Sequence, residues 1–268
     1  MDSRLAAATP DARAGRQGEV HWLVLAVAVA ALAALAVLVF ALVPAIPQDP
    51  AYHGFADDRA WLGVPNFANV ASNIPMLLLG ASGVFSLSRV SPGLPMPACI
   101  AFSVAVILVG TGSGYYHYAP TRDTLVWDRL PMTVAFMTLF AIVIHDRLSV
   151  RLARWLLWPL VLAGVGSVLY WDWTELEGRG DLRLYGLVQF VPLLLVPAML
   201  LTRPRGMLHT GWLWAMIGLY GAAKLAEQAD APILAVTGIL SGHSLKHLLA
   251  AGAIYCALRA MHRRLRLP

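Results

Sequence analysis

Charged side chains are scarce in this sequence, at 13% of 268 residues, whereas hydrophobic residues make up 59% and the mean hydropathy is +0.66. A soluble domain of ordinary composition has about 25% charged residues, because it must cover its surface with polar groups. So few charges exclude a soluble globular protein of this length. The composition instead predicts an integral membrane protein that crosses the bilayer several times.

Lysine and cysteine are also nearly absent. The net charge of +5 comes mainly from arginine, because the sequence has only two lysines, Lys224 and Lys246. Because the arginines stand at the ends of apolar segments, they report membrane topology, and no nucleic-acid partner is predicted. Cys99 and Cys256 lie inside apolar segments, so no disulfide framework is expected. The dominance of arginine over lysine, together with abundant alanine, favours a bacterial source.

Long apolar segments are what the sequence has in abundance. Residues 1–21 are rich in alanine, arginine and aspartate and are predicted to form a disordered tail. The apolar segment at 22–44 exceeds the roughly 7–15 apolar residues of a signal peptide, which predicts a retained transmembrane helix. Further segments of membrane-spanning length follow at 69–88, 96–117, 125–145, 153–171, 184–202, 211–227 and 239–260. The expected fold is all-α, with eight spans.

The distribution of arginine tests this count. Thirteen of the eighteen arginines lie in segments that face inward if both termini are cytoplasmic. Four lie in the opposite loops, and Arg129 lies just inside the fourth apolar segment at its outer end. This bias follows the positive-inside rule and favours eight spans with both termini in the cytoplasm. The predicted location is the plasma (inner) membrane of a bacterium.

Three of the predicted helices carry polar or ionisable side chains at the same outer depth. Ser113 and His117 end the third segment, and Asp128 lies near the start of the fourth. His243 and His247, at the start of the eighth, are four residues apart and share one helix face, which makes them half of a metal site. Ionisable groups in a membrane are costly and usually face a cavity or one another. With His117 as third ligand, the pattern predicts a zinc site whose fourth position is open to water.

Such a zinc would activate water and polarise a carbonyl oxygen, which suits hydrolysis of an amide or ester. Asp128 would orient the water or take its proton, and Ser113 would donate a hydrogen bond to the developing oxyanion. Structural roles are the alternatives: a carboxylate favoured at a helix N-terminus and a serine bonded to its own helix. Two other functions stay open, a receptor-like protein with a structural zinc and a proton-coupled transporter that needs no metal.

Two charged groups near the histidines are expected to be structural. Lys224 and Glu227 are three residues apart, which predicts an ion pair on one helix face. Lys246 lies between His243 and His247 in the sequence. It is expected to point away from their face and to form an ion pair or lie at the membrane interface.

Together, these residues resemble the signature of the alkaline ceramidase family, within the CREST superfamily of membrane hydrolases. That signature is S-x3-H, then Asp eleven residues later, then H-x3-H, and it is carried here by Ser113, His117, Asp128, His243 and His247. The run Asn69-Val70-Ala71-Ser72-Asn73 is similar to the Asn-x-x-Ser-Asn at the start of the family's first helix. The resemblance covers roughly residues 57–262.

The resemblance implies a seven-helix domain over 57–262, to which the helix at 22–44 is an addition. It also implies a zinc held by the three histidines and hydrolysis of the amide of ceramide, drawn from the bilayer, to a sphingoid base and a fatty acid. A related N-acyl lipid fits as well, and the site would face the extracytoplasmic side. The oligomeric state is not given by the sequence.

Calcium is a second metal that the resemblance implies. Animal members bind it through acidic residues ahead of the first family helix, one of them a Glu three residues before the Asn-x-x-Ser-Asn. Asn66 stands at that position here, and Asp57 and Asp58 are the carboxylates that remain nearby. A weak calcium site at Asp57 and Asp58 is therefore the most that the sequence predicts.

Overall fold

The computed structural model describes residues 26–27, 30–31 and 33–262. The chain divides into two compact units, and the boundary lies between Pro44 and Ala45. In the first unit, an apolar helix runs over Ala33–Leu42. The tail predicted at 1–21 lies outside the described residues, and so do residues 22–25, 28–29 and 32 of the helix predicted at 22–44. The second unit contains all the elements considered below.

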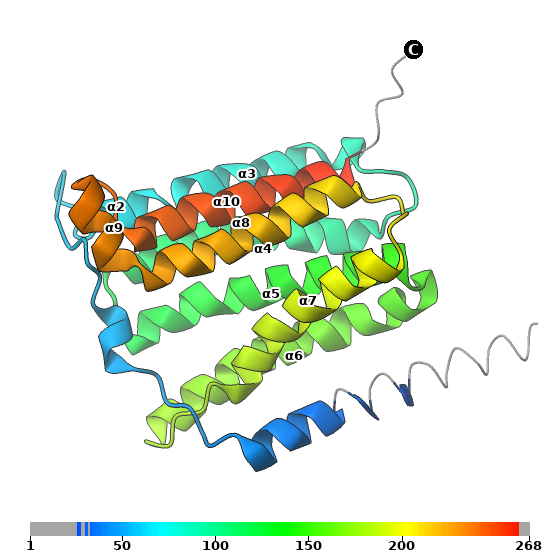
Figure 1. Ribbon diagram of the computed structural model, residues 1–268, viewed down its shortest axis with the longest axis horizontal. Coiled ribbons are helices and arrows are strands. Elements are labelled where there is room, and N and C mark those ends of the chain that lie inside the picture. Colours follow the sequence, from blue (N-terminus) through cyan, green and yellow to red (C-terminus); the bar gives the residue numbers. More distant parts are fainter. Residues whose placement is uncertain (1–25, 28–29, 32, 263–268) are drawn as a thin grey trace, which may run out of the picture. The chain divides into compact units, whose positions relative to one another are not determined.

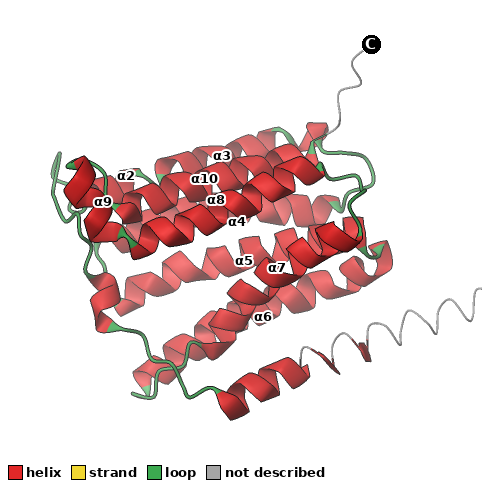
Figure 2. Cartoon of the chain, viewed as in Figure 1, coloured by secondary structure: helices red, strands yellow, loops and turns green. Residues whose placement is uncertain are grey.

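The second unit is built from helices (Figures 1 and 2). No strand occurs in the part of the chain that the structure describes, apart from two isolated β-bridges. This confirms the all-α prediction. In chain order the elements are η1 (Pro50–His53), α2 (Phe67–Ala71), α3 (Ile74–Phe85), η2 (Leu87–Arg89), α4 (Met96–Tyr118), α5 (Arg122–Arg147), α6 (Val150–Leu176), α7 (Arg183–Thr202), α8 (Thr210–Gln228), α9 (Asp230–Thr237) and α10 (Gly242–Met261).

The helices are those of a multi-pass membrane protein. Within the described residues, five helices are long and apolar enough to cross a membrane: α2 with α3 as one, then α4, α5, α6 and α7. The bent pair α9 and α10 makes a sixth if it counts as one span. The prediction of eight is not reached for two reasons. Lys224 and Glu227 lower the apolar character of α8, and the segment at 22–44 is only partly described.

The chain before α10, the helix that corresponds to the segment predicted at 239–260, contains a helix that was not predicted. It forms the short helix α9, which ends at Gly238, where φ is +70°. α10 then begins at a bend of 100°. The side chain of Ser241 caps it by accepting a hydrogen bond from the N–H of Ser244, at 3.1 Å. α9 therefore lies between the two helices that the sequence predicted at 211–227 and 239–260.

Gly242, the first residue of α10, lets this helix start close to the end of α8. A Cβ at Gly242 would lie 2.1 Å from the carbonyl oxygen of Ala226, far inside van der Waals contact. α10 packs along α8 and also contacts α3 and α2, while α4 packs between α3 and α5. In Figure 1, α2 and α9 lie together at one end of this unit. That end holds the start of α10 and its histidines.

The opposite end of α5 holds a buried ion pair. Arg147 Nε lies 2.9 Å from Asp146 Oδ2, and both side chains are 0% exposed. The Arg147 guanidinium donates to the carbonyls of Arg203 (3.0 Å) and Leu208 (3.2 Å). The Asp146 carboxylate accepts from the N–H of Met207 at 2.6 Å. The pair therefore anchors the connection between α7 and α8.

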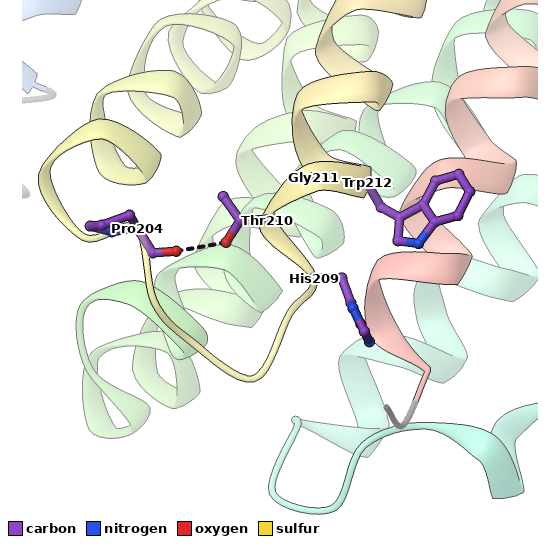
Figure 3. A pocket seen from close by; sticks show the side chains of 5 residues that line it. All are labelled: Pro204, His209, Thr210, Gly211 and Trp212. Carbon is purple, nitrogen blue, oxygen red and sulfur yellow. Dashed lines mark hydrogen bonds between the residues drawn. The ribbon is translucent and has the colours of Figure 1, made fainter. Parts of the chain in front are cut away.

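A hollow of about 490 Å³ lies beside this connection (Figure 3) and is lined by Pro204, His209, Thr210, Gly211 and Trp212. The Thr210 hydroxyl donates to the carbonyl of Pro204 at 2.7 Å. Thr210 begins α8, whereas Glu227, close to the histidines, lies in its last turn. At about 1.5 Å per residue these two positions are about 25 Å apart. The hollow is therefore separate from the histidine site.

Candidate metal centre

Three buried histidines converge where α4 ends and α10 begins. His117 lies in the last turn of α4, and His243 and His247 lie in the first two turns of α10. One ring nitrogen from each lies within 4.8 Å of the other two. The Nε2 atoms of His117 and His247 are 3.1 Å apart. The structure thus brings the three predicted ligands together in a group that could hold a metal ion.

Residues between α2 and α3 orient His247. The Ser72 hydroxyl donates to the carbonyl of Asn69 at 3.0 Å, and the same oxygen lies 2.8 Å from Nδ1 of His247. A Ser72 hydroxyl that donates its proton to Asn69 accepts the N–H of His247 Nδ1. This tautomer leaves a lone pair on His247 Nε2, the nitrogen that faces His117. Asn69 is itself fixed, since its side-chain oxygen accepts from the hydroxyl of Ser244 at 2.8 Å.

The other two histidines are held mainly through their backbone. The N–H of His243 donates to Asp230 Oδ1 at 2.7 Å, and the second oxygen of Asp230 accepts from the N–H of Ala56 at 2.9 Å. The carbonyl of His117 accepts from the side chain of Asn66 at 2.9 Å. Nδ1 of His117 is buried and has no hydrogen-bond partner among the described residues. Three neutral imidazoles whose ring nitrogens converge in this way fit a metal ion.

Ser113 and Asp128 interact across the contact between α4 and α5. Their side chains are buried, and the Ser113 hydroxyl hydrogen-bonds with the Asp128 carboxyl group. Gly112 permits this approach, because a Cβ there would lie 2.1 Å from the carbonyl oxygen of Trp127. The charge of Asp128 also interacts with that of Lys246 on α10. Asp128 therefore belongs to the same buried polar region as the histidines.

The segment before α2 packs against the histidines. No pattern in the sequence indicated this contact. The ring centroid of Phe55 lies 4.8 Å from those of both His117 and His243. Nearby, Nδ1 of His53 lies 3.0 Å from the hydroxyl of Tyr116. Burial lowers the pKa of His53, so its ring is neutral at pH 7. His53, the last residue of η1, and Phe55 thus form part of the surroundings of the site.

Both lysines of the chain share one carboxylate beside His243. Lys224 Nζ lies 2.8 Å from Glu227 Oε2, which confirms the predicted pair, and Lys246 Nζ lies 2.9 Å from Glu227 Oε1. Lys246 Nζ is also 3.0 Å from Nε2 of His243. The expected ion pair of Lys246 is therefore present, but the prediction that it points away from the histidines is wrong. Residues three apart are neighbours on a helix, and the long lysine side chain reaches back across that turn.

Asp57 and Asp58, the predicted calcium ligands, have different surroundings. Arg59 donates to both carboxylate oxygens of Asp57, each at 2.7 Å, and these hydrogen bonds lower the pKa of Asp57. Other N–H groups of Arg59 donate to the carbonyls of Gly238 (3.0 Å) and Ile239 (3.2 Å). Asp58 is exposed. Calcium binding stays a prediction, and an ion at Asp57 would have to displace Arg59.

A comparison with models of protein families shows to which family the chain belongs. The family model Ceramidase matches residues 63–264, which is most of the sequence. The chain belongs to the ceramidase family. This confirms the predicted resemblance, and ceramidase membership implies a hydrolase. The matched region includes all five signature residues, whereas Asp57 and Asp58 precede it. A search of curated proteins found no match to the chain.

Proposed function

We propose that this protein is a zinc-dependent membrane amidohydrolase that cleaves the amide bond of ceramide or a related N-acyl lipid. The products would be a sphingoid base, or another amine, and a free fatty acid. The observation that supports this proposal most directly is the buried group of three histidines in a chain of the ceramidase family. A structural zinc usually has four protein ligands, whereas a catalytic zinc has three and an open position. The three-histidine group therefore supports an enzyme over a receptor-like protein with a structural zinc.

The ligands proposed for zinc are His117, His243 and His247. Imidazole nitrogens suit zinc among the transition metals, and zinc has no redox chemistry that would compete with hydrolysis. When bound, the ion would polarise the amide carbonyl and lower the pKa of a water molecule. The contact between Ser72 and His247 Nδ1 supports this ligand set, because it keeps Nε2 free of a proton.

Asp128 and Ser113 are the residues to which we assign the proton and oxyanion roles. The Asp128 carboxylate orients the attacking water, takes its proton and passes it to the leaving amine. The Ser113 hydroxyl donates a hydrogen bond to the oxygen that gains negative charge. Their burial and mutual interaction support these roles, because a hydrogen bond in low dielectric is stronger than in water.

We further propose the membrane arrangement given by the arginine bias. Residues 1–21 form a cytoplasmic tail, the helix at 22–44 is an added span, and 57–262 form the seven-helix ceramidase domain. Both termini lie in the cytoplasm, and the site faces the extracytoplasmic side of a bacterial inner membrane. The acyl chain of the lipid enters laterally between helices, while water reaches the site from outside. The apolar helices of the second unit support this arrangement.

The test is the zinc content of the purified protein, measured together with fatty-acid release from a panel of N-acyl lipids. We expect near-stoichiometric zinc in the wild type and loss of both zinc and hydrolysis in His247→Gln. His262→Gln is the matched control, because His262 caps the far end of α10 and contacts Ser86. Zinc without hydrolysis would favour the receptor-like function, and a protein without zinc would overturn the site.

A further inference from the structure

Lys246 and Asp230 are charged side chains that contact the candidate zinc ligand His243. The Lys246 ammonium lies 3.0 Å from Nε2 of His243 and 2.9 Å from Glu227, and the lysine side chain is 17% exposed. A lysine at membrane depth is costly and tends to mark a functional site. The ion pair with Glu227 accounts for part of its environment. It does not account for an ammonium beside the ring of a histidine that the proposed function assigns to a zinc ion.

The charges around Lys246 balance one another before a metal ion is counted. Glu227 is shared by Lys246 and Lys224, so one carboxylate serves two ammonium groups. Asp128 supplies the second negative charge in this region. These four charges cancel. The remaining carboxylate beside the ligands, Asp230, accepts from the backbone N–H groups of His243 and Ala56, so a zinc ion held by three neutral histidines would leave a net positive charge. A partly buried cationic site favours an anionic ligand, because burying an uncompensated charge is costly.

We infer that Lys246 determines substrate specificity by binding a carboxylate on the amine half of the substrate. The inference rests on the proposed function, and it names the substrate class as N-acyl amino acids, in preference to N-acyl lipids with a neutral amine half. A neutral ceramide offers Lys246 only hydroxyl groups. The carboxylate of an N-acyl amino acid lies two bonds from the amide nitrogen, so its negative charge is next to the scissile bond. Lys246 would bind it through a charge-assisted hydrogen bond.

Two substrates of equal chain length isolate this interaction. N-dodecanoylglycine carries a carboxylate where N-dodecanoylethanolamine carries a hydroxymethyl group. We expect the wild type to prefer the glycine conjugate in kcat/KM. Lys246→Gln should reduce that preference by about 10-fold to 100-fold, as expected for a hydrogen bond to a charged group. Lys246→Arg, which keeps the charge, should retain part of the preference.

The matched control is Lys224→Gln. Lys224 binds the same carboxylate of Glu227, but its side chain is 37% exposed. If Lys246 acts only through its ion pair with Glu227, the two substitutions should alter the substrate preference equally. That result would overturn the inference. Zinc content measured on every variant separates a change of preference from a loss of metal.

Binding to the metal-free protein gives a second readout that does not depend on turnover. In calorimetric titrations of chelator-treated wild type in detergent, N-dodecanoylglycine should bind more tightly than N-dodecanoylethanolamine, and Lys246→Gln should remove the difference. Equal binding and equal hydrolysis of the two amides would overturn the inference and leave the proposed function standing. A binding difference without hydrolysis would support the inference and count against the proposed function. If free dodecanoate binds as tightly as the glycine conjugate, Lys246 holds the acyl carboxylate, and the assignment to the amine half is wrong.

Discussion

The two ends of α5 bury polar groups in different ways. At the Arg147 end, a carboxylate and a guanidinium bind each other and the backbone of the connection between α7 and α8. At the Asp128 end, the neighbouring groups include three histidines on other helices, and Nδ1 of His117 has no partner within the described residues. One end thus balances its charges with an ion pair from within the chain. The other brings together three imidazoles that fit a partner from outside it.

This difference separates stability from function. A buried ion pair is costly to break, because the remaining charge stays in a low dielectric without compensation. A group of neutral histidines has no such penalty, and losing one ring mainly removes a ligand atom. We therefore expect substitutions at the Arg147 end to affect folding first. Those at the Asp128 end should affect metal content and turnover first.

The largest effect is expected for Arg147→Ala. It leaves the Asp146 carboxylate buried and unpaired, which should cost about 3–5 kcal/mol of stability. The measurement is the Tm of the purified protein in detergent, with zinc content determined on the fraction that stays folded. Arg122→Ala is the control, because Arg122 pairs with Asp123 and Asp172 at the surface, and such pairs contribute at most about 1 kcal/mol. Equal shifts in Tm would contradict the distinction between the two ends.

Gly112→Ala should impair turnover while zinc is retained. The added Cβ would meet the carbonyl of Trp127 at 2.1 Å, so α4 and α5 must separate and Ser113 must shift relative to Asp128. Displacing a catalytic pair by about 1 Å can lower the rate by about 100-fold. Gly114→Ala is the matched control, since a Cβ there has no atom within 4 Å. Loss of zinc in Gly112→Ala would show that the histidines also depend on this helix contact.

A smaller effect is expected for Ser72→Ala, which removes the acceptor of the His247 Nδ1 proton. Loss of such a partner typically lowers metal affinity by about 10-fold to 100-fold. Competition with a zinc chelator measures the affinity directly. Ser103→Ala serves as the control, because Ser103 is equally buried but bonds to the carbonyl of Cys99 within α4. If both variants hold zinc as tightly as the wild type, Ser72 does not orient the ligand.

Much of the fold and the ligand group could be predicted from the sequence. Apolar segments of bilayer length give helices directly, and the spacing of His243 and His247 places both on one face. The arginine bias fixed the direction of each helix in the membrane. It therefore placed His117 at the same depth as His243 and His247 and predicted that the three would lie together. These features depend on local periodicity and on the bilayer, and a single sequence contains both kinds of information.

What the sequence did not reveal depends on contacts between distant segments. The apolar pattern predicted no helix between the segments at 211–227 and 239–260, where α9 forms and the chain then reverses its direction. Asp230 gained its role only because this reversal brings it to the N–H of His243. Phe55 lies in a polar loop without periodicity, and its packing against two histidines is visible only in three dimensions.

The smallest effect is expected at Asp57, where an ion pair at the histidine end of the unit can be compared with the pair at Arg147. Arg59 lowers the pKa of Asp57 below its value of about 3.9 in unfolded chains. The pair therefore contributes stability above about pH 4, and the contribution is lost as the pH falls through the folded pKa. The Tm of Asp57→Asn should lie below that of the wild type at pH 7, and the two should converge in acid. A difference that persists unchanged into acid would mean that the charge of Asp57 is not what stabilises the loop. A rise in wild-type Tm on adding calcium would show that the ion displaces Arg59, in which case the Asp57 carboxylate functions as a ligand.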